Sequence, residues 1–402
     1  MEKMFYIGLA VILAVGLALC LFSCGKTDTS AGGTEQTSGD AIGAENKDTD
    51  TQTVAPDTEK QPSDPEPAGL LPFSKGININ GMETFLSENR YGFFERGVRL
   101  VTTESTFTDI KAQGFDHVRI PVNFYTAYFE APTGKYNYTT EDIMEYVDTA
   151  IELAIKNGLY VTLDFHGWFY IGEEEDDYEE FLYCWTQVAD RYKDCSELLN
   201  FELLNEPWYS NGKAQTYLSD KRLNEMQAAA IKIIRDTGSN NSTRLIICCT
   251  ADGNKAWKLD QLKLPEDENL AVAIHEYEPK AFTHQNFSWA GYGNQRTTLD
   301  DLGGFRKATD WDFGQIESFM KKTGIPVVLN EFGMNLAMSS EEDVKEYLGG
   351  VTDFCRENGI PWAYWQYYDE YNFEGSMSLF RKKSYFGSQE WDQTALDALF
   401  DR

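Results

Sequence analysis

The stretch Leu203-Leu204-Asn205-Glu206-Pro207 decides how the fold is interpreted. It closes the mostly apolar run 198–204, which has the length of one buried strand and which the proline ends. Glu206 is therefore expected just beyond the carboxyl end of a strand. The same pattern returns downstream, where the apolar run 325–329 leads into Asn330-Glu331-Phe332-Gly333. Two glutamates, each delivered by the end of its own strand, form a candidate pair of catalytic carboxylates.

Strand-like apolar runs alternate with amphipathic helical stretches from Leu70 to the end of the 402-residue chain. The expected strands are 76–79, 118–122, 159–165, 198–204, 245–250, 270–274, 326–329 and 361–365. The expected helices are 105–113, 142–157, 178–194, 223–236, 313–323 and 340–358. Eight buried strands with helical crossovers predict one (β/α)8 domain, a TIM barrel, over residues 70–402. A doubly wound open sheet is the alternative fold.

The first 24 residues are expected to be a targeting segment. A weakly charged start precedes the apolar run 5–22, which is about one membrane span long. The run ends in Leu21-Phe22-Ser23-Cys24-Gly25, which resembles the lipobox of bacterial lipoproteins. The resemblance implies a signal peptide that is removed, a lipid anchor on Cys24 and an exported protein at the membrane or cell surface of a bacterium. The alternative is an uncleaved membrane anchor in which Cys24 is incidental.

Residues 25–69 are expected to form a disordered linker, because they are rich in Ser, Thr, Gly, Pro and acidic residues and contain few large apolar ones. Self-repulsion of the acidic groups should keep this tether extended. The net charge of the whole chain is −30. Such a charge excludes a nucleic-acid partner, because phosphates require a basic face.

Seven cysteines are present, and five of them lie outside the targeting segment: Cys184, Cys195, Cys248, Cys249 and Cys355. An odd number cannot all pair within one chain, so buried free thiols are expected. The sequence leaves open whether Cys184 and Cys195 form a disulfide bond. The chain has only four histidines and no zinc-type spacing of Cys and His, so neither a metal nor a cofactor is expected.

Polar and aromatic residues lie at the ends of six expected strands. If the barrel forms, the carboxyl ends of its strands share one face, where active sites of such barrels lie. The residues at these ends are Arg119, His166, Asn205, Glu206, His275, Tyr277, Glu331 and Trp365. Each has a structural alternative: Arg119 could form an ion pair across the barrel, His166 and Trp365 could be core, and Asn205-Glu206-Pro207 could cap a helix. The combination, not any one member, indicates an active site.

This ordered set resembles glycoside hydrolase family 5, the retaining cellulase-like enzymes, from about Leu70 to the C-terminus. The resemblance implies that Glu206 is the acid/base and Glu331 the nucleophile, while the other six residues bind substrate. Similarity extends to 277–279, 282–285 and 164–168. The chain departs from the family at Asn330, where relatives often have a small residue, and at Glu276. Glu276 should point away from the site if its strand alternates.

The implied reaction needs two carboxyl groups roughly 5–5.5 Å apart, one protonated and one ionised. Arg119 and a hydrogen bond from Tyr277 would favour ionised Glu331, whose charge would raise the pKa of Glu206. Asn205 is expected to bind the substrate 2-hydroxyl. Two histidines, His166 and His275, would hold sugar hydroxyls or orient the glutamates.

Aromatic side chains are expected to support the sugar rings. Trp365 would form the floor under the ring being cleaved. Four tryptophans in loops after strands are candidate platforms for flanking sugars, and two of them are expected to serve only in packing: Trp168, Trp208, Trp257 and Trp289.

The sequence therefore predicts a lipid-anchored, monomeric endo-β-1,4-glucanase that takes a β-linked polysaccharide or oligosaccharide as substrate. One alternative keeps the mechanism and changes the substrate to mannan, xyloglucan, mixed-linkage glucan or a glycolipid. Another is a surface lipoprotein that binds glycan without cleaving it, for which a missing carboxylate would be the signature. A metalloenzyme is disfavoured, because no His-Glu-x-x-His motif or carboxylate cluster occurs.

Overall fold

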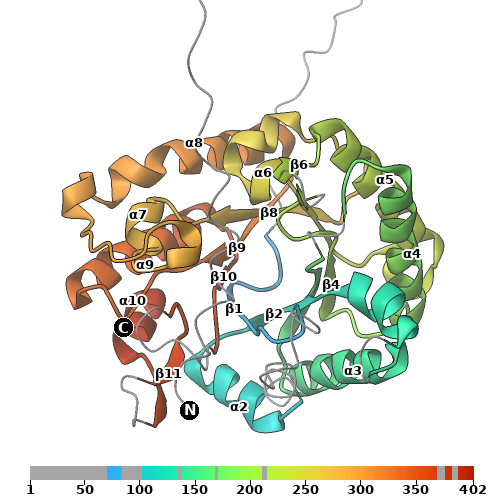
Figure 1. The fold of residues 1–402 in the computed structure, drawn as a ribbon, viewed down its shortest axis with the longest axis horizontal. Coiled ribbons are helices and arrows are strands. Elements are labelled where there is room, and N and C mark those ends of the chain that lie inside the picture. Colours follow the sequence, from blue (N-terminus) through green and yellow to red (C-terminus); the bar gives the residue numbers. More distant parts are fainter. Residues whose placement is uncertain are drawn as a thin grey trace, which may run out of the picture. The chain divides into compact units, whose positions relative to one another are not determined.

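Eight parallel strands close into a barrel in the computed structural model (Figure 1), in the order β1-β2-β3-β4-β7-β8-β9-β10. The strands are β1 (Lys75–Asn78), β2 (His117–Val122), β3 (Tyr160–Phe165), β4 (Leu199–Glu202), β7 (Ile246–Cys249), β8 (Leu270–Glu276), β9 (Val327–Phe332) and β10 (Trp362–Tyr364). Because β1 pairs in parallel with both β2 and β10, the sheet has no edge. This closure confirms the predicted (β/α)8 barrel and excludes the open sheet.

The structure describes the barrel domain with short gaps. The described residues are 70–83, 102–134, 138–167, 171–210, 215–368, 376–382 and 388–402. The predicted targeting segment, the linker 25–69, Cys24 and Trp168 lie outside these residues. Within them, no helix combines the length and the apolar character needed to cross a membrane.

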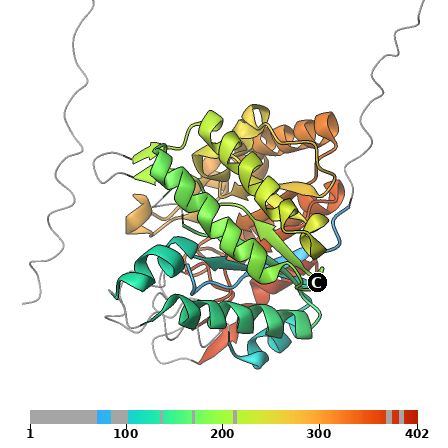
Figure 2. The same ribbon diagram turned by 90° about the vertical axis from the view of Figure 1, so that its right-hand side faces the viewer.

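Long amphipathic helices connect successive strands and run along the outside of the barrel (Figures 1 and 2). They are α2 (Glu104–Gln113), α3 (Thr140–Lys156), α4 (Glu175–Tyr192), α5 (Asp220–Asp236), α8 (Phe305–Thr323) and α9 (Glu341–Asn358). Each turns an apolar stripe inward; in α4, Phe181, Trp185 and Val188 are fully buried. The six predicted helices are thus confirmed. The largest error is the start of α8, which begins at Phe305 after Gly304, eight residues before the expected position.

The crossover between β7 and β8 is irregular. It contains only the short helix α6 (Ala251–Asn254) and the 3-10 helix η5 (Ala256–Gln261), which packs against α8. Other short elements are α7 (Lys280–Thr283), the hairpin β5 (Trp208–Ser210) and β6 (Gln215–Tyr217), the pair β11 (Phe380–Lys382) and β12 (Gln389–Trp391), and the final helix α10 (Gln393–Phe400). Their runs are too short to show a period, so the sequence analysis did not find them.

All five cysteines of the barrel domain are free thiols. Four are buried, and Cys195 is partly exposed. The prediction of buried thiols is therefore confirmed for four of the five, and the Cys184–Cys195 bridge that the sequence left open is not formed.

Candidate active site

Arg119 on β2 is the centre of the site, and its side chain is completely buried. Its Nε and Nη2 atoms donate to the two oxygens of Glu202 at 2.7 and 2.8 Å, and Nη2 also lies 3.0 Å from Asp164 Oδ2. Nη1 donates to Glu331 Oε1 at 2.5 Å and to Asn78 Oδ1 at 2.9 Å. The fork geometry of a guanidinium permits such simultaneous contacts, which a lysine could not make. Arg119 therefore forms an ion pair across the barrel and also holds Glu331.

Glu331 lies within β9, one residue before its end, and its side chain is 6% exposed. Arg119 binds one carboxylate oxygen, and the hydroxyl of Tyr277 donates to the other at 3.0 Å. Tyr277 is in turn braced by the loop that follows β8: Thr283 Oγ1 donates to its carbonyl at 2.6 Å, and the His284 ring packs edge-on at 5.1 Å. The two hydrogen bonds that the sequence analysis expected to Glu331, from Arg119 and from Tyr277, are thus both present.

Glu206 lies four residues beyond the end of β4. The backbone between them keeps hydrogen bonds to both neighbouring strands, because Leu203 N donates to Ile247 O and Asn205 N donates to Phe165 O, each at 2.9 Å. At Glu206 the chain turns with φ of +34°, a value that side chains other than glycine seldom adopt. The Glu206 amide donates to Oδ1 of the fully buried Asn254 at 3.0 Å. Asn254 thus fixes the turn that aims the Glu206 carboxyl group into the barrel mouth.

The two glutamates face one another across His275. His275 Nδ1 lies 2.9 Å from Glu206 Oε1 and 3.4 Å from Glu331 Oε2. One oxygen from each glutamate and this nitrogen all lie within 4.8 Å of one another. Carboxyl groups roughly 5–5.5 Å apart suit retaining chemistry, whereas inversion needs roughly 6.5–9.5 Å to admit a water. The close approach of one oxygen from each glutamate agrees with the shorter of these two spacings.

Glu206, His275 and Glu331 are also the only group of side chains in the described part of the chain that is spaced closely enough to hold a metal ion. The donor set could contact a divalent cation. However, the Arg119 guanidinium already neutralises Glu331 at 2.5 Å and would repel a cation placed between the glutamates. The arrangement is better suited to acid–base and nucleophilic chemistry.

Burial changes the protonation behaviour of Glu206 and of His275. Burial raises the pKa of Glu206, and Lys255 is the cation that opposes this most. The side chain is still 29% exposed, so its desolvation is partial. Burial also lowers the pKa of His275 to about 3, so the imidazole is neutral near pH 7 and its Nδ1–H can donate to a carboxylate. The raised pKa of Glu206 was expected, but burial, not the charge of Glu331, is its leading cause.

Asn205 and His166 belong to the same polar network. Asn205 Oδ1 accepts from Arg119 Nη2 at 2.7 Å, and its amide nitrogen lies 3.2 Å from His166 Nε2. His166 Nδ1 lies 2.8 Å from Asp164 Oδ2, which orients the ring. Trp365 follows β10 and stacks on His166 with ring centroids 5.9 Å apart and an interplanar angle of 19°. These contacts place Asn205, His166 and Trp365 around the glutamates, as predicted.

The predicted departures at Asn330 and Glu276 do not disturb the glutamates. Asn330 Nδ2 donates to Glu202 Oε2 at 2.6 Å, so this side chain belongs to the buried network below the site. Glu276 is buried on the other side of β8, where its Oε1 accepts from Glu278 N at 2.6 Å. Burial raises the pKa of Glu276 to about 8. The expectation that Glu276 points away from the site is confirmed.

Two of the four tryptophans that were predicted as sugar platforms have described side chains. Trp168 lies outside the described residues, and the side chain of Trp208 is also not described. Trp289 is 77% exposed beside His284, with ring centroids 5.6 Å apart. Trp257 is 40% exposed and faces Trp311. The last two therefore present open rings.

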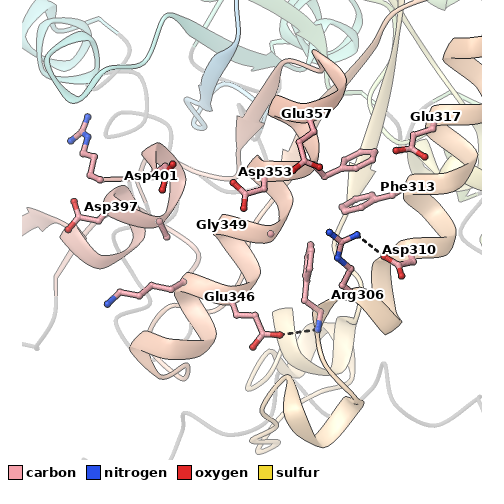
Figure 3. Close-up of a pocket in the computed structure, with 16 residues that line it drawn as sticks. Arg306, Asp310, Phe313, Glu317, Glu346, Gly349, Asp353, Glu357, Asp397 and Asp401 are labelled. Carbon is pink, nitrogen blue, oxygen red and sulfur yellow. Dashed lines mark hydrogen bonds and ion pairs between the residues drawn. The ribbon is translucent and has the colours of Figure 1, made fainter.

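A hollow of about 610 Å³ lies elsewhere, between α8, α9 and α10 (Figure 3). Its wall carries acidic groups such as Glu317, Asp353 and Glu357, and its floor includes Phe313, which stacks on Phe354 at 3.8 Å. None of the predicted site residues lines it. Among the described residues, its acidic side chains do not come close enough together to hold a metal ion. This hollow is therefore not the candidate active site.

The sequence analysis gave no role to several residues that hold the site together: Asn78, Asp164, Glu202 and Asn254. Asp164 and Glu202 carried a usable signal, because charged residues inside strands that are otherwise apolar must have a buried partner. They are paired in register across β3 and β4, so both point into the barrel beside Arg119. Asn254 lies in the irregular crossover and carried no such signal.

Replacing Asn254 by alanine should lower kcat by roughly tenfold to a hundredfold while changing KM little. The Glu206 amide would lose its acceptor, and the turn with positive φ would no longer be held, which misplaces the carboxyl group. Steady-state kinetics on a β-glucan, together with circular dichroism to verify folding, measure this effect. An unchanged kcat in a folded Asn254→Ala protein would show that the turn at Glu206 keeps its conformation without the Asn254 side chain.

Comparison with known proteins agrees with this geometry. Residues 71–370 match the family Cellulase (glycosyl hydrolase family 5). Endoglucanase H of Acetivibrio thermocellus is 26% identical over 85% of this chain, and Endoglucanase 1 of Ruminococcus albus is 30% identical over 67%. The chain spans 35% and 65% of their respective lengths, less than two thirds of either.

Among solved structures, endoglucanase Cel5A of Thermotoga maritima superposes with a TM-score of 0.65 at 30% identity, covering 81% of this chain and 97% of its own. That enzyme has been solved in complex with cellobiose and with mannotriose.

Proposed function

The chain belongs to glycosyl hydrolase family 5, the cellulase family, and from this premise we propose that it is a retaining endo-β-1,4-glucanase. The observation that carries the proposal is the convergence of Glu206 and Glu331 at the barrel mouth, with oxygens within 4.8 Å and distinct surroundings. A glycan-binding protein without activity would have no need for this pair. Both carboxyl groups and Asn205 are in place, which favours the enzyme.

In the proposed reaction, Glu331 attacks the anomeric carbon while Glu206 protonates the departing glycosidic oxygen. The bond between the anomeric carbon and that oxygen breaks, and an ester to Glu331 forms. Glu206, now ionised, removes a proton from water, which attacks the same carbon and releases Glu331. Arg119 and Tyr277 stabilise Glu331 as a carboxylate before attack and after release.

The remaining residues position the sugar. Asn205 is held by Arg119 so that its amide nitrogen faces the site beside His166, where it can donate to the substrate 2-hydroxyl. Such hydrogen bonds strengthen in the transition state and supply several kcal/mol. Trp365 offers an apolar face beneath the same sugar, because its ring stacks on His166 and packs against the cluster of Tyr277, Phe287 and Met377.

A β-1,4-glucan is the proposed substrate. Several relatives are named endoglucanases, and the Thermotoga enzyme has been solved with cellobiose. The same enzyme in complex with mannotriose makes mannan the second candidate. A panel of carboxymethylcellulose, mixed-linkage β-glucan, xyloglucan and mannan should show the fastest cleavage for the unbranched glucans. Faster cleavage of mannan would keep the mechanism and change the substrate, and cleavage of none would contradict the proposal.

We also propose that Cys24 is lipidated and becomes the N-terminal residue after removal of residues 1–23, and that the acidic linker 25–69 carries the barrel as a monomer at the bacterial surface. The support is the sequence Leu21-Phe22-Ser23-Cys24-Gly25 after an apolar run. Growth with an alkyne-tagged fatty acid should label the wild-type protein and not Cys24→Ala. Equal labelling of the two proteins would contradict the anchor.

A further inference from the structure

The contact between Tyr277 and Glu331 depends on how two neighbouring loops lie at the barrel mouth. Tyr277 directly follows β8, whereas Glu331 lies one residue before the end of β9, and the Tyr277 hydroxyl donates to Glu331 Oε2 at 3.0 Å. The pairing of β8 with β9 shifts in register between Ile274 and His275. Tyr277 lies beyond the last paired residue of β8, so contacts made by the loops after the two strands must fix its position.

Asn335, in the loop after β9, makes the first set of these contacts. It follows Glu331 closely in the sequence, and its side chain is completely buried. Its Nδ2 donates to the carbonyl oxygen of Gln285 at 2.8 Å, and its Oδ1 accepts from the amide of Ala337 at 3.1 Å. Its own amide donates to Thr283 O at 2.9 Å. The side chain and the backbone of this one residue therefore both fasten the loop after β9 to the loop after β8, and its buried amide group is fully partnered.

Gln285, in the loop after β8, makes the reciprocal contact. Its side chain is buried, and Nε2 donates to Ser339 Oγ at 3.1 Å. The Ser339 hydroxyl donates in turn to the carbonyl oxygen of Asn335 at 2.9 Å. The second amide atom of Gln285, Oε1, accepts from the Thr297 amide at 3.1 Å and so ties in a later part of the same loop. Asn335 and Gln285 together form a loop clamp, because the side chain of each reaches the other's loop.

Thr283 connects the loop clamp to Tyr277. Its carbonyl oxygen accepts from Asn335 N, whereas its hydroxyl donates to Tyr277 O at 2.6 Å. The hydroxyl has a single proton, so towards His284 Nδ1, 2.9 Å away, it can only accept. Burial lowers the pKa of His284 to about 3, so near pH 7 this ring is neutral with its proton on Nδ1. The His284 ring packs edge-on against Tyr277 at 5.1 Å, and Tyr277 is thus held at its backbone and at its ring.

We propose that Asn335 and Gln285 are positioning residues: their loop clamp holds the Tyr277 hydroxyl against the nucleophile. The inference rests on the proposed function, in which Glu331 alternates between a carboxylate and an ester. A hydrogen bond to a charged oxygen is roughly twice as strong as one to a neutral oxygen, so the Tyr277 bond favours the step that returns Glu331 to the carboxylate. A loosened clamp therefore slows hydrolysis of the ester more than it weakens substrate binding.

A double-mutant cycle with an activated aryl β-cellobioside tests the loop clamp. Asn335→Ala should lower kcat roughly tenfold to a hundredfold and leave KM unchanged or lower it, because the ester is hydrolysed more slowly. In a Tyr277→Phe background, which lacks the hydroxyl, the same change should lower kcat by less than about twofold. Asn241→Ala is the matched control and should lower stability but not kcat. This asparagine is also completely buried, with Nδ2 donating to Ala189 O at 2.9 Å, but it precedes β7 at the opposite end of the barrel.

The outcomes separate the loop clamp from the reaction. An unchanged kcat in folded Asn335→Ala, or the same loss with and without the Tyr277 hydroxyl, overturns the clamp while wild-type cleavage leaves the function intact. A raised KM with unchanged kcat would show a role in binding and also overturns it. Wild-type protein that cleaves no β-glycoside overturns both. If Asn335→Ala does not fold, Gln285→Ala takes its place in the same cycle, because the Asn335 contacts to Thr283 O and Gln285 O persist in that variant.

Discussion

Replacing Glu331 by alanine should lower kcat on β-glucan by at least about 10⁴-fold, which corresponds to roughly 5 kcal/mol of lost transition-state stabilisation. The reason is that this side chain forms the covalent bond, so no other group can take its place. The charge of Arg119 remains paired, because Arg119 still binds Glu202 and Asp164 and also donates to Asn205. The variant should therefore stay folded.

Steady-state kinetics test this prediction, and circular dichroism verifies that the variant is folded. Glu331→Gln is the isosteric control. Glutamine keeps the shape of the side chain and one of its two acceptor oxygens but cannot attack as a carboxylate, so its loss of activity should be comparable. Added azide should restore turnover of an activated glycoside in Glu331→Ala with inversion at the anomeric carbon. Near wild-type cleavage by either folded variant would remove Glu331 from the nucleophile role.

Replacing Glu206 by alanine should have a different signature, because its task depends on the leaving group. Turnover of β-glucan should fall by about 10²- to 10⁴-fold, the range for removal of a general acid. An aryl glycoside with a strongly acidic phenol needs no protonation and should still form the intermediate. Turnover should then be limited by hydrolysis of the ester on Glu331, and azide should accelerate it with retention.

The pH profile tests the same role. Glu206 must be protonated for the first step, and burial raises its pKa, so wild-type activity should fall on the alkaline side as Glu206 ionises. This limb should disappear in Glu206→Ala with the activated substrate. A retained alkaline limb, or equal loss on activated and natural substrates, would show that another group donates the proton.

The strand ends were predictable from the sequence because closure of a parallel barrel brings them to one face. Glu206, Glu331, His275 and Tyr277 were found in this way, and the structure places all four together. Their exact position relative to the strands was less predictable. Glu331 lies inside β9, whereas Glu206 is four residues beyond β4, since pairing at the rim becomes irregular before the chain turns.

The support beneath the glutamates was only partly predictable from separate strands. The charges of Glu202 and Asp164 inside mostly apolar strands indicate buried partners, but only the register across β3 and β4 shows that both face Arg119. The position of Asn254 could not be predicted, because it lies in α6, a four-residue element with positive φ at Asp252 and Gly253. So short and irregular an element has no hydrophobic period. The leading cause of the raised pKa of Glu206 was also missed, because desolvation depends on packing that no short stretch contains.

The most direct test of the account is to trap the intermediate with an activated 2-fluoro-cellobioside and locate the adduct by mass spectrometry. The fluorine slows both steps, and the good leaving group speeds only the first, so the glycosyl ester accumulates. The account predicts inactivation with one fluorocellobiosyl group on the peptide that contains Glu331, and hydrolysis of β-glucan with retained configuration. An adduct on Glu206, or inverted product with no adduct, would contradict it.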